Sequence, residues 1–132
     1  MNGVSKGLLR AWQAAILLLA LAIALGSLLP LPELKSAGGL DKLEHLLAYF
    51  ALALLGSGIV DPARLWVVLV RSFLFGLVIE LLQAFGSAGR MADWSDLAAN
   101  AAGILAAWLA AGGGRAGWAR RVETRLRRLP PS

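Results

Sequence analysis

Four apolar stretches alternate with short polar segments along the chain. They cover residues 11–29, 43–60, 65–85 and 96–111, and the first of them contains no charged side chain. A helix of about 20 residues crosses a hydrocarbon core of roughly 30 Å, because each residue adds about 1.5 Å. The pattern predicts an all-α membrane protein in which four transmembrane helices form a bundle, as one domain over residues 1–114.

Proline, glycine and capping residues mark the ends of the predicted helices. Pro30 follows the first apolar stretch, Pro62 separates the second from the third, and glycines 112–114 follow the fourth. Proline fits the first turn of a new helix, and glycine commonly ends one. We expect Ser95 or Asp96 to be the N-cap of the fourth helix, because short polar side chains accept hydrogen bonds from its first free amides.

Composition supports a membrane protein and limits its chemistry. Hydrophobic residues make up 58% of the chain and charged residues 16%, below the roughly 25% that is usual in soluble domains. The chain has no cysteine, which excludes disulfides, thiol nucleophiles and thiolate metal ligands. Because His45 is the single histidine, any metal site would use mostly oxygen ligands.

The basic residues are concentrated after the last apolar stretch. Six of the thirteen Lys and Arg lie within residues 115–132, so we expect no nucleic-acid partner despite the net charge of +5. Trp118, Val122, Leu126 and Leu129 share one helical face, and arginines occupy most of the rest. We predict a basic amphipathic helix that lies on an anionic membrane surface. A disordered tail that serves only as a topology signal is the alternative.

The distribution of basic residues also predicts an orientation. Four spans place both termini on one side, together with Lys6, Arg10 and Arg64. The opposite loops hold Lys35, Lys42 and Arg90. Cytoplasmic loops carry the excess of Lys and Arg, so both termini are expected in the cytoplasm.

Most of the other polar side chains fall at the outer ends of the predicted spans. They open the second span, close the third, and lie before or within the first turns of the fourth. The set is Asp41, Lys42, His45, Tyr49, Glu80, Gln83, Arg90, Asp93, Asp96 and Asn100. Spacings of three and four residues put members of each group on one helical face. We predict that these side chains line one ligand-binding pocket.

Glu80 lies about six residues before the end of its span, roughly 9 Å from the interface. A carboxylate at that depth costs several kcal/mol unless it is paired, hydrated or protonated, so a functional role is the default hypothesis. The structural alternative is a bond to Arg90 or Asn100 that holds the bundle together. Arg90 suits a phosphate or carboxylate ligand, or a pair with Asp93 or Asp96.

Three roles are open to His45: general base, metal ligand or hydrogen-bonded scaffold residue. Together with Asp41, Glu80, Asp93 and Asp96 it offers ligands that suit Mg²⁺ or Mn²⁺. No recognised ligand spacing supports such a site, so we expect no metal and no other cofactor. His45 and Glu80 are the candidate catalytic residues, and the nearby serines lie in loops without a nucleophile motif.

The segments DKLEHLLAYFALALLG and ELLQAFGSAGRMADWSDLAANAAG resemble the VanZ-like family of bacterial membrane proteins. The family pattern reads D-K-x-x-H-x-x-x-Y-x-x-L, then E-x-x-Q, R-x-x-x-x-x-D and D-x-x-x-N-x-x-G. It falls on Asp41, Lys42, His45, Tyr49, Leu52, Glu80, Gln83, Arg90, Asp96, Asn100 and Gly103. Asp93 also matches a family position, and the resemblance covers residues 41–103.

The resemblance implies a role in the cell envelope. The founding member is associated with low-level resistance to the glycopeptide teicoplanin, and other members lie beside exopolysaccharide genes. The leading hypothesis is a module that binds the headgroup of a membrane lipid, a lipid-linked glycan or a lipoglycopeptide at the outer face. A membrane enzyme that hydrolyses or transfers such a headgroup is the rival, and a subunit that assembles with envelope proteins is the third.

Overall fold

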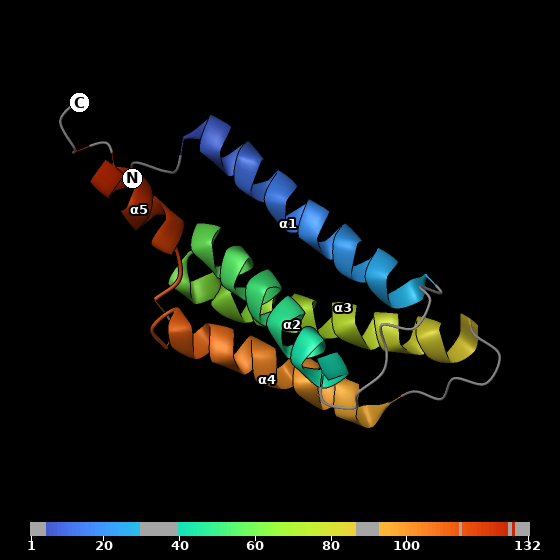
Figure 1. Ribbon diagram of the computed structural model, residues 1–132. Coiled ribbons are helices and arrows are strands. Elements are labelled where there is room, and N and C mark those ends of the chain that lie inside the picture. The colour runs from blue at the N-terminus through green and yellow to red at the C-terminus, as the bar shows by residue number, and fades with distance from the viewer. Residues whose placement is uncertain (1–4, 30–39, 87–92, 114, 127, 129–132) are drawn as a thin grey trace.

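The computed structural model describes residues 5–29, 40–86, 93–113, 115–126 and 128 (Figure 1). The elements are α1 (Lys6–Leu28), α2 (Leu40–Ile59), the 3-10 turn η1 (Pro62–Arg64), α3 (Leu65–Gly86), α4 (Trp94–Ala110) and α5 (Trp118–Leu126). This described part of the chain contains no strand, so the all-α prediction is confirmed. Each predicted span corresponds to one helix, and the largest difference is at α1, which begins at Lys6 and not at residue 11.

Three helical segments are long and apolar enough to cross a membrane. They are Lys6–Leu28, Leu40–Ile59 and Pro62–Gly86, judged by length and composition over the described residues. The fourth predicted span, α4, is shorter, with 17 residues. A fourth membrane crossing therefore remains a prediction.

The most extensive contact among the described helices is between α2 and α4, which lie side by side (Figure 1). A buried cluster of Tyr49, Leu52, Ala53, Ile104 and Ala107 fills the contact between them. Gly103 makes the close approach possible, because a Cβ at this position would collide with the backbone carbonyl of Leu46. This contact fixes the start of α4 beside the start of α2, where the polar residues lie.

The helix α1 lies across α2 and α3 and has a largely uncovered apolar surface (Figure 1). Near one end the Trp12 indole donates a 2.8 Å hydrogen bond to the Leu55 carbonyl, and near the other the Gln83 amide donates one of 2.8 Å to the Ser27 carbonyl. No residue of α1 is buried, and the side chain of Leu17 is 69% exposed. An apolar surface of this kind suits contact with lipid.

The helix α5 begins against the bundle. The Trp118 indole donates to the Leu54 carbonyl and to the Ser57 hydroxyl, both at 3.1 Å, and its ring meets Trp12 edge to face at 5.2 Å. At the next turn an Arg120 guanidinium nitrogen lies 2.5 Å from the Asp61 carboxylate. Trp118 therefore contacts the protein, whereas the sequence pattern grouped it with a membrane-facing side.

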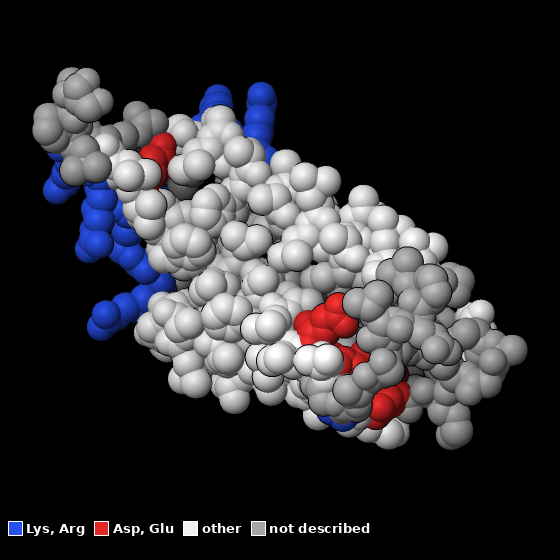
Figure 2. Space-filling model, viewed as in Figure 1, with Lys and Arg blue, Asp and Glu red and all other residues white. Residues whose placement is uncertain are grey.

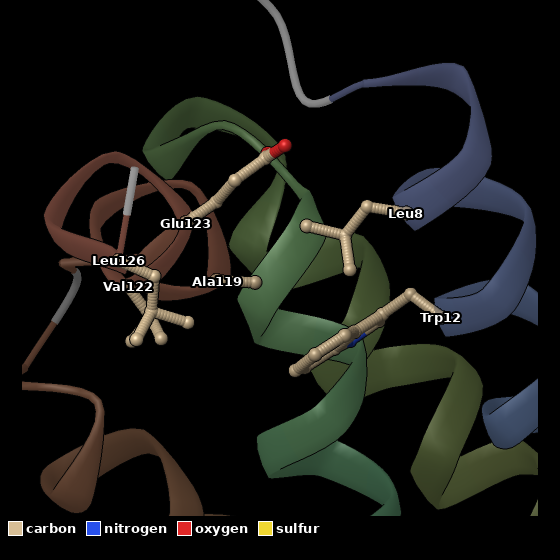
Figure 3. Close-up of a pocket in the computed structure, with 6 residues that line it drawn as sticks. All are labelled: Leu8, Trp12, Ala119, Val122, Glu123 and Leu126. Atoms are coloured by element: carbon tan, nitrogen blue, oxygen red, sulfur yellow. The ribbon is translucent and has the colours of Figure 1, made fainter. Parts of the chain in front are cut away.

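An apolar groove of about 410 Å³ lies between α1 and α5 (Figure 3). Its lining consists of Leu8, Trp12, Ala119, Val122, Glu123 and Leu126. Val122 and Leu126 are exposed, as the amphipathic pattern predicts, while Leu129 lies outside the described residues. The contact of this face with a membrane stays a prediction.

The two ends of the bundle differ in charge. On the face shown in Figure 2, Lys and Arg gather at the end that carries α5, and most of the Asp and Glu lie at the opposite end. The start of α2, the end of α3 and the start of α4 meet at this acidic end (Figure 1). The fold therefore brings three of the predicted polar segments to the same end.

Candidate functional site

The first turns of α2 present Asp41, Lys42 and His45 to the start of α4. Asp41 and His45 are one turn apart, as their four-residue spacing predicts. The side chains of Asp41 and Lys42 are 36% and 44% exposed, whereas that of His45 is 13% exposed. The site therefore has an accessible edge and a more enclosed interior.

The helix α4 begins with Asp93 as its N-cap, so the expected cap at Ser95 or Asp96 is wrong. The Asp93 carboxylate accepts hydrogen bonds from the Ser95 amide at 2.8 Å and from the Ser95 hydroxyl at 2.5 Å. These bonds, with the nearby Lys42 ammonium, hold the pKa of Asp93 below its usual range. With the cap at Asp93, Asp96 falls in the first turn of α4 and turns toward α2.

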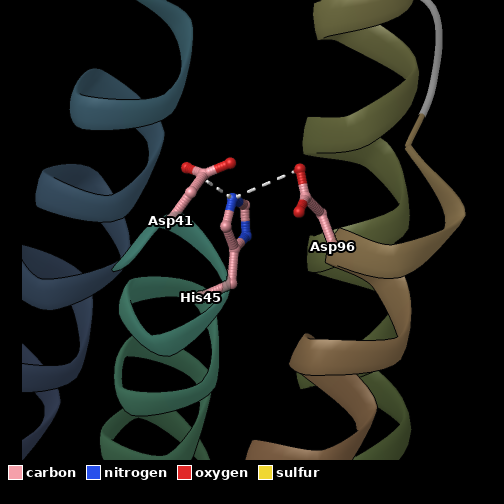
Figure 4. A group of neighbouring side chains, drawn as sticks. All are labelled: Asp41, His45 and Asp96. Carbon is pink, nitrogen blue, oxygen red and sulfur yellow. Dashed lines mark ion pairs between the residues drawn. The ribbon is translucent and has the colours of Figure 1, made fainter. Parts of the chain in front are cut away.

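His45 lies between the two helices (Figure 4). Its Nδ1 is 3.1 Å from the Asn100 side-chain oxygen, and its Nε2 is 3.9 Å from Asp41 Oδ1 and 3.8 Å from Asp96 Oδ2. Because an amide oxygen only accepts, Nδ1 donates the proton and the neutral ring has its lone pair on Nε2. That lone pair faces two carboxylates at distances too long for a hydrogen bond.

Lys42 connects the remaining groups of the site. Its ammonium donates a 2.6 Å hydrogen bond to the Ser95 hydroxyl and lies 3.5 Å from Asp96 Oδ1 and 3.7 Å from Asp93 Oδ2. The sequence predicts Ser95 only as a helix cap or as a serine in a loop. The signal that could have identified it is its position two residues after Asp93, where its amide and hydroxyl both reach the capping carboxylate.

Glu80 is buried and joins α3 to the beginning of α4. Its Oε1 accepts a hydrogen bond from the Asp93 backbone amide. The predicted partner Asn100 pairs with His45 instead, and Arg90 lies outside the described residues. Glu80 is therefore joined to the start of α4 by a backbone contact that sequence spacing did not indicate.

Tyr49 and Gln83 occupy the borders of the site. Tyr49 lies one turn beyond His45, is 1% exposed, and has no hydrogen-bond partner for its hydroxyl among the described residues. Gly76 makes room there, because a Cβ at this position would come within 2.9 Å of both Tyr49 and Asn100. Gln83 donates to the Ser27 carbonyl and thereby connects α3 to α1.

The fold defines the class of the protein as all-α, with three helices of membrane-spanning length and a polar site at one end. A family model described as VanZ/LLP1 matches residues 6–112. The chain belongs to the VanZ/LLP1 family, which confirms the resemblance found in the sequence. No match was found among the curated proteins or among the solved structures.

Proposed function

We propose that the protein is a membrane module that binds a polar headgroup at the acidic end of its helix bundle. The ligand belongs to the cell envelope: a membrane lipid, a lipid-linked glycan or a lipoglycopeptide. The proposal includes a fourth membrane crossing by α4 and an inner-membrane location with both termini in the cytoplasm. The arginine-rich end of the molecule in Figure 2 supports this orientation.

The observation that carries the proposal is that the polar side chains do not satisfy one another. Nε2 of His45 is 3.8–3.9 Å from the carboxylates it faces, and Asp96 Oδ1 is buried without a hydrogen bond from the described residues. A cluster that served only to hold helices together would close such gaps, since unpaired buried polar groups are costly. Hydrogen-bonding capacity that is not used within the protein, beside the half-exposed side chains of Asp41 and Lys42, favours a polar ligand.

The residue types suggest how a headgroup is held. The Lys42 ammonium supplies the positive charge for an anionic group, and Arg90, a candidate from the sequence alone, supplies a second. Asp41, His45 and Asp96 supply acceptors and donors for hydroxyl groups. Acyl or prenyl chains then lie along the exposed apolar faces of α1 and α2, where Leu17 and Leu47 are uncovered.

Catalysis is the second candidate function. His45 faces Asp41 and Asp96, which is the pairing a general acid–base requires, although the distances exceed hydrogen-bond length. Family membership also makes teicoplanin resistance and envelope polysaccharide formation candidate processes for this chain. In either process the immediate event at the site is recognition of an envelope headgroup.

Native mass spectrometry of the detergent-purified protein tests this proposal. Wild type should retain an envelope lipid or lipid-linked species, and His45→Gln should lose it, because the central donor and acceptor of the site change. Glu44→Gln is the matched control, since Glu44 is exposed on the same turn of α2. Equal retention by His45→Gln would contradict the proposal. Conversion of the retained species to a product of different mass would indicate the enzyme instead.

A further inference from the structure

We propose that Asp41, His45 and Asp96 form a binding site for one divalent transition-metal ion. Their ligand atoms, the His45 ring nitrogen and one oxygen from each carboxylate, all lie within 4.8 Å of one another (Figure 4). No recognised ligand spacing in the sequence predicts such a site. The three residues come from two helices, so their proximity depends on the packing of α2 against α4.

The distances from His45 Nε2 to the two carboxylates suit a bound ion between them better than direct hydrogen bonds. The His45 Nε2 atom lies 3.9 Å from Asp41 Oδ1 and 3.8 Å from Asp96 Oδ2. In a tetrahedral site with bonds of about 2.1 Å, neighbouring ligand atoms stand about 3.4 Å apart. These two separations exceed that spacing by a few tenths of an ångström. The three ligand atoms lie within 4.8 Å of one another, so the half-exposed Asp41 side chain would rotate toward Asp96 on binding an ion.

The orientation of His45 is that of a metal ligand. Its Nδ1 donates to the buried Asn100 side chain, which leaves the Nε2 lone pair facing the two carboxylates. Metal-binding histidines typically donate their second ring N–H to a carboxylate or carbonyl in this way, and the bond fixes the ring and its tautomer. Asn100 is therefore a positioning residue for the proposed site.

Asp96 gives an independent reason to expect a cation. The residue is 7% exposed, and its Oδ1 atom is buried without a hydrogen-bond partner in the described part of the chain. Lys42 approaches Oδ1 only to 3.5 Å, while Oδ2 faces His45. Lys42 is the charge partner of Oδ1, so a metal ion on Oδ2 would give the other oxygen of this buried carboxylate a partner as well.

The charge and donor types narrow the identity of the ion. Among the described side chains around His45, the carboxylates of Asp41, Asp93 and Asp96 outnumber the single ammonium of Lys42. A divalent cation would offset that excess. One imidazole with two carboxylates favours Mn²⁺ or Zn²⁺, because Mg²⁺ and Ca²⁺ prefer oxygen ligands alone.

Titration with Mn²⁺ requires no added envelope ligand, and its readout is the free ion, so its result is distinguishable from that for headgroup binding. The chain is purified in detergent with a tag free of histidine and treated with chelator, and free Mn²⁺ is measured by electron paramagnetic resonance. Wild type should bind one Mn²⁺ saturably, and Zn²⁺ should displace it. Saturable binding should disappear in His45→Gln, and affinity should fall at least about tenfold in Asp41→Asn.

Two controls separate loss of the site from loss of the fold. Asp41→Asn changes a half-exposed side chain, so it should retain the wild-type helix content by circular dichroism. Glu44→Gln removes an exposed carboxylate from the same turn of α2 and should bind Mn²⁺ as wild type does. Absence of saturable Mn²⁺ binding in wild type would overturn the proposal. Unchanged binding in a folded Asp41→Asn, or an equal loss in Glu44→Gln, would do so too.

Discussion

Glu80 shows how one buried carboxylate can hold a site together. It lies on α3, yet its oxygen accepts the backbone amide of Asp93, the residue that caps α4. Asp93 in turn accepts two hydrogen bonds from Ser95, and the Ser95 hydroxyl accepts a hydrogen bond from Lys42 of α2. A change at Glu80 is therefore transmitted through the start of α4 to the polar groups of α2.

The contribution of Glu80 can be measured by comparing two substitutions. Glu80→Ala removes the acceptor of the Asp93 amide and should lower the free energy of unfolding by about 1–3 kcal/mol. Glu80→Gln keeps an acceptor oxygen of similar shape and should cost less. Thermal unfolding in detergent provides the measurement. Equal melting temperatures for the two variants would show that the bond to Asp93 does not stabilise the protein.

The sequence identified the polar residues of the site but not most of their partners. Asp41, His45, Asp96 and Asn100 do meet, because helical spacing gives the face of each helix on which they lie. The hydrogen bond between the Asp93 amide and Glu80 depends on the relative height of α3 and α4, that is, on how far one helix is shifted along its axis against the other. Spacing within a single helix contains no information about that height.

At the scale of elements, the contact between α2 and α4 determines where the site forms. Gly103 lies against the Leu46 carbonyl, and Ala107 is buried next to it along the same face. A side chain at residue 103 would force the two backbones apart. Separation there would move Asp96 and Asn100 of α4 away from His45 of α2.

Gly103→Ala tests this close approach. The added methyl group has no space, so the variant should lose on the order of 1–3 kcal/mol of stability. Gly26→Ala in α1 is the matched control, because a Cβ there meets no atom within 4 Å. It should be neutral or slightly stabilising, since alanine is the better helix former by up to about 1 kcal/mol. Similar melting temperatures for both variants would contradict the packing described here.

The attachment of α5 depends on an ion pair outside the membrane-spanning segments. The hydrogen bond from Arg120, with its positive charge, lowers the pKa of Asp61. A carboxylate with a lowered pKa contributes to docking at every pH above its ordinary pKa. That contribution is lost only as the pH falls through the lowered value, so docking should be insensitive to pH near neutrality.

Nuclear magnetic resonance titration of the Asp61 carboxyl group checks the cause of this shift. In Arg120→Gln the pKa should rise toward its ordinary value, because the hydrogen bond and the charge are both removed. Arg64→Gln should raise it less, since Arg64 acts only through its more distant charge. A pKa that responds equally to the two substitutions would argue against the Arg120 contact.

Apolar runs predicted the helices well and their ends less well. Each of the four stretches became a helix, because a long apolar run without proline has few alternatives to helical structure in a membrane. The N-cap of α4 was misplaced, since Asp93, Ser95 and Asp96 are all competent caps by residue type. The docking of Trp118 on Trp12 joins residues far apart in sequence, which periodicity within the tail does not reveal.

At the scale of the whole molecule, the two ends of the protein differ in the sign of their charged side chains, and the surface between them is apolar. Lys and Arg gather at the end that carries α5, and most of the Asp and Glu gather at the end where α2 and α4 begin (Figure 2). Exposed leucines of the four long helices lie between these two ends. Lipid would solvate the middle of such a molecule and water its two ends. The polar site would then lie at one membrane surface.

Cysteine labelling tests which surface that is. The chain has no native cysteine, so a single cysteine reports one position. In intact cells, Ser36→Cys and Ser87→Cys should react with a membrane-impermeant thiol reagent, and Ser132→Cys should react only after permeabilisation. Labelling of Ser132→Cys in sealed cells would reverse the orientation and place the polar site on the cytoplasmic face.

The ligand is proposed to bind between His45 and the carboxylates of Asp41 and Asp96, where no direct hydrogen bond joins them. A crystal structure determined in a lipid phase, from protein purified with its native lipids, tests this most directly. We expect density for a polar group within hydrogen-bonding distance of His45 or Lys42, with the carboxylates of Asp41 and Asp96 turned toward it. Direct hydrogen bonds from His45 to both carboxylates, with no density beside them, would show a closed structural cluster and contradict the account.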